Sequence, residues 1–234
     1  MEKNKVTVIG VDNFGLEVIG QLKCANIDVL EYIAINSNEE VNQPTINDEN
    51  IVIYVGNCDE SNTTKSLLKL VENISANKKY NVAYLSGNSI DETVIDSISL
   101  NNCSVVLTDK VVDSIVSFVE SIYYPGMISI DLDDYKLFFN NYKKIYYQQL
   151  TSLDFENDLV DFMKEVSNKH DLSSIERIMY VISNNQNVSL RMSEEVSNKL
   201  KAYTTKDTTS LFGTSDFKTY AGKYKLFMFY SCKE

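Results

Sequence analysis

The sequence predicts an α/β protein whose first half forms a doubly wound parallel sheet and whose second half forms an α+β layer. Two observations lead to this fold class. Up to about residue 124, short apolar runs rich in β-branched residues alternate with helix-like segments, an order that favours a parallel sheet with right-handed crossovers. Beyond that residue the pattern changes to helices and a few longer strands.

The first half contains alternating strands and helices. The expected strands are Lys5–Val11, Asp28–Asn36, Ile51–Val55, Asn81–Leu85 and Ser104–Leu107. The expected helices are Leu16–Ala25, Thr63–Ser75, Asp91–Ser99 and Lys110–Tyr124. The segment Ser37–Asn50 is polar, contains Pro44 and shows no period, so we expect a loop there.

The second half begins at Pro125-Gly126, which stops the preceding helix because proline lacks an N–H and glycine tolerates a left-handed turn. Asp133 and Asp134 stand where the next helix should begin. That helix is expected over Asp133–Leu150, on an aromatic stripe made of Tyr135, Phe138, Phe139, Tyr142 and Tyr146. The remaining expected elements are helices Glu156–Asn168 and Glu194–Tyr203 and strands Arg177–Ser183, Ser210–Lys218 and Lys223–Ser231.

Composition excludes several classes of function. The net charge of −11 disfavours nucleic acid and anionic membrane surfaces as partners. No apolar run is long enough for a membrane span, and no signal peptide is recognised, so we expect a cytoplasmic protein without a membrane anchor. The four cysteines are scattered and His170, the one histidine, lies in a polar stretch expected to be an exposed loop. We therefore expect no metal site.

Two strand–loop–helix junctions are candidate anion sites. The first follows the first strand and contains Gly10 and Gly15, a weak match to a dinucleotide fingerprint. The second follows the third strand and contains Gly56, Ser61 and Thr63, without a complete Walker pattern. A dinucleotide or other small ligand at the strand ends is one interpretation, and simple solvated turns are another.

Three segments carry a resemblance to FtsZ, a member of the tubulin superfamily. They are Lys5-Val-Thr-Val-Ile-Gly-Val, Glu31-Tyr-Ile-Ala-Ile-Asn36 and Pro125-Gly-Met-Ile-Ser-Ile-Asp-Leu-Asp-Asp134, and the strands near the end of the chain are similar too. The resemblance implies a Rossmann-like GTPase-type domain over residues 1–109, a connecting central helix over 110–126, and a smaller α+β C-terminal domain over 127–234.

FtsZ proteins bind GTP with glycine-rich loops, and a loop of one subunit completes the site of the next. By this resemblance Asp131 and Asp134 match the two acids of that loop, whereas Ser129 replaces its usual asparagine. The nucleotide loops depart from the family. The glycine-rich signature is replaced by the run Cys58, Asp59, Glu60, Ser61, Asn62, Thr63 and Thr64, and Asp12 stands in the first loop. Bulky acidic side chains there oppose a triphosphate sterically and electrostatically.

The sequence therefore predicts a pseudo-GTPase of bacterial cell division or the cytoskeleton that binds no cofactor and contacts FtsZ-like subunits. In this interpretation Gly10, Gly15, Gly56, Ser61 and Thr63 form a degenerate site. The alternative is an active, divergent GTPase that forms its own filaments. It would use GTP and Mg²⁺, with Asp131 and Asp134 as catalytic residues. Helix capping is the structural interpretation of these two aspartates.

Overall fold

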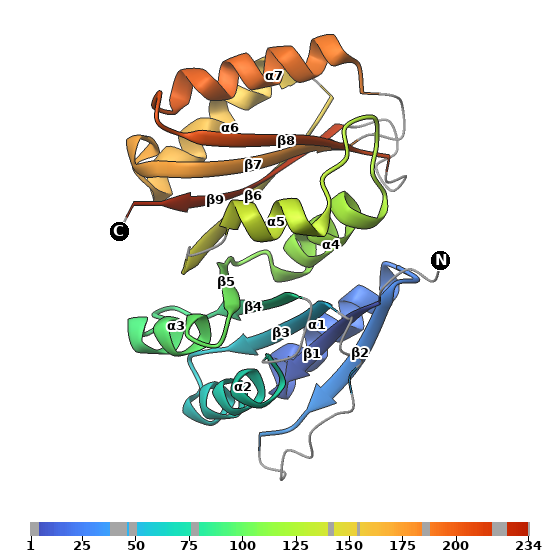
Figure 1. Ribbon diagram of the computed structural model, residues 1–234, viewed down its shortest axis with the longest axis vertical. Coiled ribbons are helices and arrows are strands. Elements are labelled where there is room, and N and C mark those ends of the chain that lie inside the picture. The colour runs from blue at the N-terminus through green and yellow to red at the C-terminus, as the bar shows by residue number, and fades with distance from the viewer. Residues whose placement is uncertain are drawn as a thin grey trace. The chain divides into compact units, whose positions relative to one another are not determined.

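The computed structural model describes residues 5–37, 46, 51–75, 80–139, 143–153, 155–183, 188–216 and 224–233. Its contacts divide the chain into two compact units (Figure 1). Unit 1 comprises Met1–Val112 with Asn141–Lys144, and unit 2 comprises Asp113–Asn140 with Ile145–Glu234. The expected assignment of domains to residues 1–109 and 127–234, joined by a connecting helix, stays a prediction.

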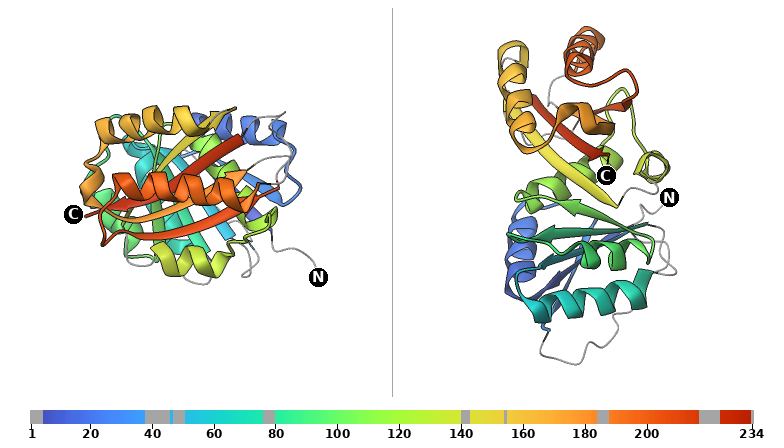
Figure 2. Two further views of the ribbon diagram at one scale, coloured as in Figure 1. Left: turned by 90° about the horizontal axis from the view of Figure 1, so that it is seen from above. Right: turned by 90° about the vertical axis from the view of Figure 1, so that its left-hand side faces the viewer.

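Unit 1 contains a parallel sheet with strand order β2-β1-β3-β4-β5. The strands are β1 (Val6–Val11), β2 (Leu30–Ile35), β3 (Ile51–Asn57), β4 (Tyr80–Ser86) and β5 (Cys103–Leu107). The helices are α1 (Asp12–Cys24), α2 (Ser61–Ile74) and α3 (Glu92–Ser99). Helix α4 (Val111–Tyr123) follows; its first two residues belong to unit 1 and the rest to unit 2. Helix α1 covers one face of the sheet, whereas α2 and α3 cover the other (Figure 2).

Burial explains why the strands of unit 1 are short continuous apolar runs. All six residues of β1 and the first six residues of β3 are buried, as expected for a parallel sheet covered on both faces. The side chains of Val52, Tyr54 and Leu67 belong to the core beneath α2 and α3. This rigid sheet fixes the positions of the loops that follow its strands.

Unit 2 contains a mixed sheet with strand order β6-β9-β7-β8. Strand β9 is antiparallel to both neighbours, and β7 is parallel to β8 across a helical crossover. The elements are α5 (Leu132–Phe139), β6 (Lys144–Ser152), α6 (Phe155–Lys169), a 3-10 turn (Leu172–Ser174), β7 (Ile175–Ser183), α7 (Leu190–Tyr203), β8 (Thr209–Ser215) and β9 (Tyr224–Cys232). The α/β fold class predicted from the sequence is confirmed.

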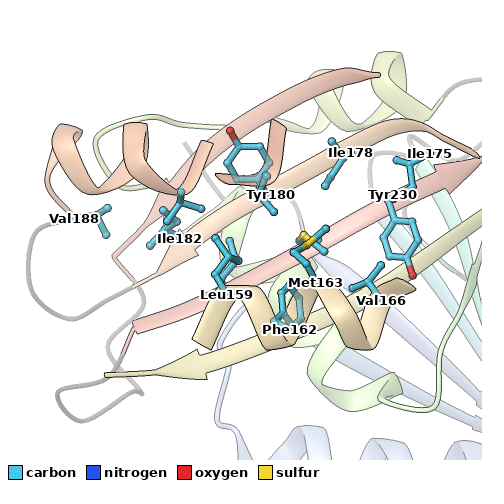
Figure 3. Packing of buried hydrophobic residues seen from close by; sticks show 14 residues of the cluster. Leu159, Phe162, Met163, Val166, Ile175, Ile178, Tyr180, Ile182, Val188 and Tyr230 are labelled. Atoms are coloured by element: carbon cyan, nitrogen blue, oxygen red, sulfur yellow. The ribbon is translucent and has the colours of Figure 1, made fainter. Parts of the chain in front are cut away.

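The core of unit 2 lies between its sheet and helices α6 and α7. Leu159, Phe162 and Met163 of α6 point toward the sheet, where Ile182 and Tyr230 are buried (Figure 3). An ion pair also lies in the interior of this unit. The Nζ of Lys225 is 3.2 Å from a carboxylate oxygen of Glu120, and both side chains are almost completely buried.

The prediction of a single helix over Asp133–Leu150 is wrong. Helix α5 ends at Phe139, and the chain continues as strand β6 from Lys144; residues 140–142 lie outside the described part. The aromatic spacing of three and four holds only within α5. Strand β6 instead pairs with β9, where Tyr147 lies opposite Phe229. The run of bulky residues that follows Lys144 favours a strand, so the continued spacing was a coincidence.

Helix α1 begins at Asp12, not at Leu16 as expected. Asp12 has a φ of +56°, a left-handed conformation that aspartate tolerates better than most residues. The tight turn at this residue lets the helix start directly after β1. The expected loop Ser37–Asn50 lies outside the described residues except for Ser37 and Ile46.

Candidate functional site

The candidate site lies in unit 1, at the carboxyl ends of β1, β3 and β4. Ligands of doubly wound sheets bind at these ends, because the loops there open between helices on opposite faces. The segments concerned are the β1–α1 junction, the β3–α2 loop and the turn after β4.

Gly10 and Gly15 hold the β1–α1 junction closed. A Cβ on Gly10 would lie 2.5 Å from the carbonyl oxygen of Gly15, and a Cβ on Gly15 would lie 2.5 Å from the Cα of Gly10. Both distances are well below van der Waals contact, so neither position accepts a side chain in this geometry. The space left by the missing side chain of each glycine is filled by backbone atoms of the other glycine.

Asp12 connects three segments of unit 1. Its carboxylate accepts a hydrogen bond of 2.7 Å from the backbone N–H of Ser37, after β2, and another from the hydroxyl of Thr63 in the first turn of α2. Partial burial acts to raise the pKa of Asp12, but the hydrogen bonds from Ser37 and Thr63 outweigh it and hold the pKa below its ordinary value. Asp12 is therefore held as an anion by a backbone N–H that follows β2 and a hydroxyl in the first turn of α2.

Thr63 is buried, and its hydroxyl is the shared member of this cluster. A carboxylate oxygen of Glu60 lies 3.3 Å from the hydroxyl oxygen, a longer contact than the one with Asp12. A hydroxyl has a single proton to donate, so the shorter contact with Asp12 receives it. Ser61, the first residue of α2, is exposed, and Gly56 is buried in β3 without a contact that demands glycine.

Asp59 connects the β3–α2 loop to the turn after β4. Its two carboxylate oxygens accept hydrogen bonds from the backbone N–H and the side-chain amide of Asn88, at 2.8 and 3.0 Å. Gly87 has a φ of +153°, and a Cβ at this residue would lie 3.0 Å from a carboxylate oxygen of Asp59. Glycine therefore lets the turn after β4 lie close to the Asp59 side chain. Burial raises the pKa of the Cys58 thiol, so this cysteine stays protonated and unreactive.

The loop of residues 125–134 lies in unit 2 and ends in a reciprocal cap. The backbone N–H of Asp131 donates to the carboxylate of Asp134 at 2.9 Å, and the N–H of Asp134 donates to the carboxylate of Asp131 at 2.8 Å. This is a capping box that starts α5. The geometry fixes both carboxylates at the surface within one turn.

The same loop is attached to strand β8. The backbone N–H of Gly126 donates to the carbonyl of Thr214, and the N–H of Thr214 donates to the carbonyl of Ile128, both at 2.8 Å. Met127 lies between these bonds with 60% of its surface exposed, and Leu137 on α5 is 72% exposed. The loop therefore presents two carboxylates and the exposed side chain of Met127, and Leu137 is exposed beyond it on α5.

The structure brings together some of the predicted site residues and not others. Gly10, Gly15 and Thr63 lie in one cluster around Asp12, whereas Ser61 points to solvent. Sequence reasoning missed Ser37 and Asn88, which supply the backbone donors. The sequence Gly87-Asn88 directly after a strand was a usable signal, because such pairs form turns at strand ends. Ser37 carries no comparable signal.

His170 is not the exposed loop residue that its polar neighbours indicated. It is half-buried, with its ring centroid 4.0 Å from that of Tyr146 and 5.6 Å from that of Tyr230. Within the described residues, no group of three or more metal-binding side chains comes together, and no helix is both long and apolar enough to cross a bilayer.

Comparison with solved structures identifies this doubly wound sheet, with its loops at the strand ends, as part of the FtsZ/tubulin fold. An empty FtsZ dimer from M. jannaschii superimposes with a TM-score of 0.76 at 13% identity, covering 97% of this chain and 88% of that one. CetZ from Methanosaeta thermophila gives 0.73 at 11% identity, covering 99% and 87%.

A third solved structure shows the same fold. GDP-form protofilaments of TubZ from Bacillus thuringiensis serovar israelensis match with a TM-score of 0.61 at 11% identity, covering 97% of this chain and 88% of that one. No protein-family model matches the sequence, and no curated protein matches it. The likeness is therefore one of fold: the chain has the FtsZ/tubulin fold.

Proposed function

We propose that this chain is a cytoplasmic, FtsZ-like pseudo-GTPase that acts through subunit-type contacts. One observation carries the proposal. The carboxylate of Asp12 occupies the donors of Ser37 and Thr63 at the strand ends, where a nucleotide phosphate would need them. A fixed acidic side chain thus takes the place of a bound anion.

Electrostatic repulsion also opposes phosphate binding at this site. Asp12, Asp59 and Glu60 place carboxylates on the loops around the same strand ends. A like-charge pair at about 5 Å costs roughly 3 kcal/mol at an effective dielectric of about 20. A micromolar affinity is worth only about 8 kcal/mol, so a few such pairs remove most of it. These residues do not fit a triphosphate.

The loop of residues 125–134 supports the second half of the proposal. Its capping box and its bonds to β8 hold Asp131, Asp134 and Met127 in a fixed arrangement at the surface. The matched structures include an FtsZ dimer and TubZ protofilaments. We infer that this loop docks on an FtsZ-like subunit, of this chain or of a partner, and that the protein modulates or forms filaments.

Nucleotide binding is the first test. Calorimetric titration of the purified chain with GTP and Mg²⁺ should give no saturable heat, and denatured protein should release no stoichiometric guanine nucleotide. Saturable binding with turnover lost in Asp131→Ala would instead establish the alternative, an active divergent GTPase. An Asp133→Ala variant, altered at an exposed aspartate of the same loop, serves as the matched control.

Docking is the second test. We expect the chain to change the sedimented mass or the length of FtsZ polymers, or to form polymers itself. Met127→Asp should remove the effect, because it places a charge in the apolar part of the loop. Leu100→Asp, at an exposed leucine of unit 1, should leave it intact. Unchanged polymers at every ratio, with no self-assembly, would contradict the proposal.

A further inference from the structure

Strand β8 ends the sheet of unit 2, and half of its outer edge is already covered. Thr214 faces outward, because its N–H donates to Ile128 and its carbonyl accepts from Gly126. The N–H of Asp216, two residues on, donates to Tyr124 at 3.1 Å. Residues 124–128 thus run along the C-terminal half of this edge as a short added segment.

In the part of the chain that the structure describes, no strand pairs with the N-terminal half of the same edge. Residues in a strand alternate, so Ser210 and Phe212 direct their backbone N–H and C=O groups to the same side as Thr214. Among the described residues, no backbone group bonds to Ser210 or Phe212 from that side. A row of unpaired backbone groups is a template for an additional strand.

A cavity of about 270 Å³ opens beside this half of the edge. Ile178, Tyr180 and Leu200 contribute its apolar lining, and Ser210 contributes to its rim. The ring of Phe212 packs against Tyr180 at 5.1 Å between centroids. Because alternate side chains of an added strand point toward the same face, one of them could enter this cavity.

The rim of the cavity is basic in a strongly acidic protein. Lys201 and Lys206 line it, together with the hydroxyls of Ser197, Thr204, Thr205 and Thr208. Neither lysine forms an ion pair within the described residues, and Asp207, exposed beside Lys206, is not part of the lining. Lys201 and Lys206 thus form a local basic patch on a chain of net charge −11, and such a patch favours a ligand that carries carboxylates.

We propose that residues Thr209–Phe212 of β8 bind an extended acidic segment of a partner protein as an additional strand. The backbone groups of Ser210 and Phe212 supply the hydrogen bonds, the cavity receives one apolar side chain, and Lys201 and Lys206 pair with carboxylates of the segment. An acidic partner segment is the occupant because its carboxylates complement these two lysines, and a second copy of the chain is the alternative that the experiment distinguishes.

Amide hydrogen exchange of the full chain, resolved by NMR, tests the proposal with a seven-residue peptide of alternating glutamate and valine. In the free chain the outward amides of Ser210 and Phe212 should exchange fast, whereas Leu211, bonded toward β7, should exchange slowly. Saturating peptide should slow Ser210 and Phe212 at least about fivefold and leave Leu211 unchanged. Titration to about 5 mM captures millimolar affinity.

Two variants separate backbone pairing from charge. Ser210→Pro removes one outward N–H at an edge where proline is tolerated and should weaken binding at least about fivefold, with the protection of Leu211 reporting an intact fold. The double variant Lys201→Glu/Lys206→Glu should weaken binding about tenfold and reverse its salt dependence, because the new glutamates repel the acidic peptide and salt screens that repulsion. The control is Lys233→Glu, which reverses the charge of an exposed lysine just after β9 and should leave peptide binding unchanged.

Three outcomes would overturn the proposal. They are no protection at these amides at the highest peptide concentration, equal binding of a peptide of alternating lysine and valine, and protection that rises with protein concentration in the absence of peptide. The last result would assign the edge to a second copy of the chain.

Discussion

Asp12 shows how a single residue can occupy a ligand site. Its side chain joins the segment after β2 to the first turn of α2, and its left-handed backbone begins α1. The same carboxylate therefore stabilises the fold and opposes a bound phosphate. Stability and nucleotide exclusion should depend on it together.

Replacement of Asp12 by alanine should lower the free energy of unfolding by about 2–3 kcal/mol. The change leaves the N–H of Ser37 without its acceptor, leaves the hydroxyl of Thr63 with only the longer contact to Glu60, and puts alanine at a φ of +56°. Urea denaturation followed by circular dichroism measures it. Asn13→Ala, at the exposed neighbouring position, should change stability by less than about 0.5 kcal/mol. Equal effects of the two substitutions would contradict this role for Asp12.

His170 should titrate below the ordinary histidine pKa. Burial against Tyr146 and Tyr230 disfavours the charged ring, and Lys169 adds repulsion, so the pKa of His170 is lowered from 6.5. The folded chain then binds fewer protons than the unfolded chain, and stability is lost as pH falls from 6.5 toward the folded pKa.

The chain contains one histidine, so its imidazole NMR signals can be followed without ambiguity. We expect a midpoint below pH 6.5 and a melting temperature that falls between pH 7 and 5. His170→Gln should flatten that part of the profile. A midpoint at or above 6.5 would show that the ring is solvated.

At the scale of elements, the β1–α1 junction depends on two glycines that pack against each other. A methyl group at Gly15 would collide with backbone atoms of Gly10, which cannot move without displacing β1. Gly20 lies in the same helix, and nothing lies within 4 Å of the position its Cβ would take. The two positions form a matched pair.

Gly15→Ala should therefore lower the free energy of unfolding by at least about 3 kcal/mol or prevent folding, because the overlap is with backbone. Gly20→Ala should raise it by about 0.5–1 kcal/mol, because alanine is the better helix former. Urea unfolding of both variants measures the difference. Similar stabilities would mean that the junction is looser than described.

For the whole molecule, buried and half-buried tyrosines predict the pH at which alkaline unfolding begins. Burial raises the pKa of Tyr80 in unit 1 to about 12, and burial does the same for Tyr123 in unit 2. Burial also raises the pKa of Tyr54 and of Tyr230. A raised acid pKa means that stability is present below pH 10 and is lost as pH rises from 10 toward 12.

Lys225 opposes this trend, because burial lowers its pKa despite the contact with Glu120, but it is one group against the several tyrosines whose pKa burial raises. We expect part of the tyrosine absorbance at 295 nm to titrate near pH 10. The remainder should ionise only together with the loss of the circular dichroism signal. Complete ionisation near pH 10 with the fold intact would contradict the burial of these rings.

The order of elements follows from the sequence by itself. Continuous apolar runs between helices specify a covered parallel sheet, because both faces of each strand must avoid water. The sequence also predicts that Gly10, Gly15 and Thr63 lie at strand–helix junctions, and the structure places them at the β1–α1 and β3–α2 junctions. The segment after Phe139 was the exception, because aromatic residues suit either element and only pairing with β9 decides for a strand.

Only the tertiary structure showed what the acidic loop residues contact. Ser37 is 25 residues from Asp12, and Asn88 is 29 residues from Asp59. Parallel pairing brings these residues together, because it aligns the carboxyl ends of strands that are distant in the chain. Sequence therefore determined which charges stand at the strand ends, and the fold decided that each finds its donors within the protein.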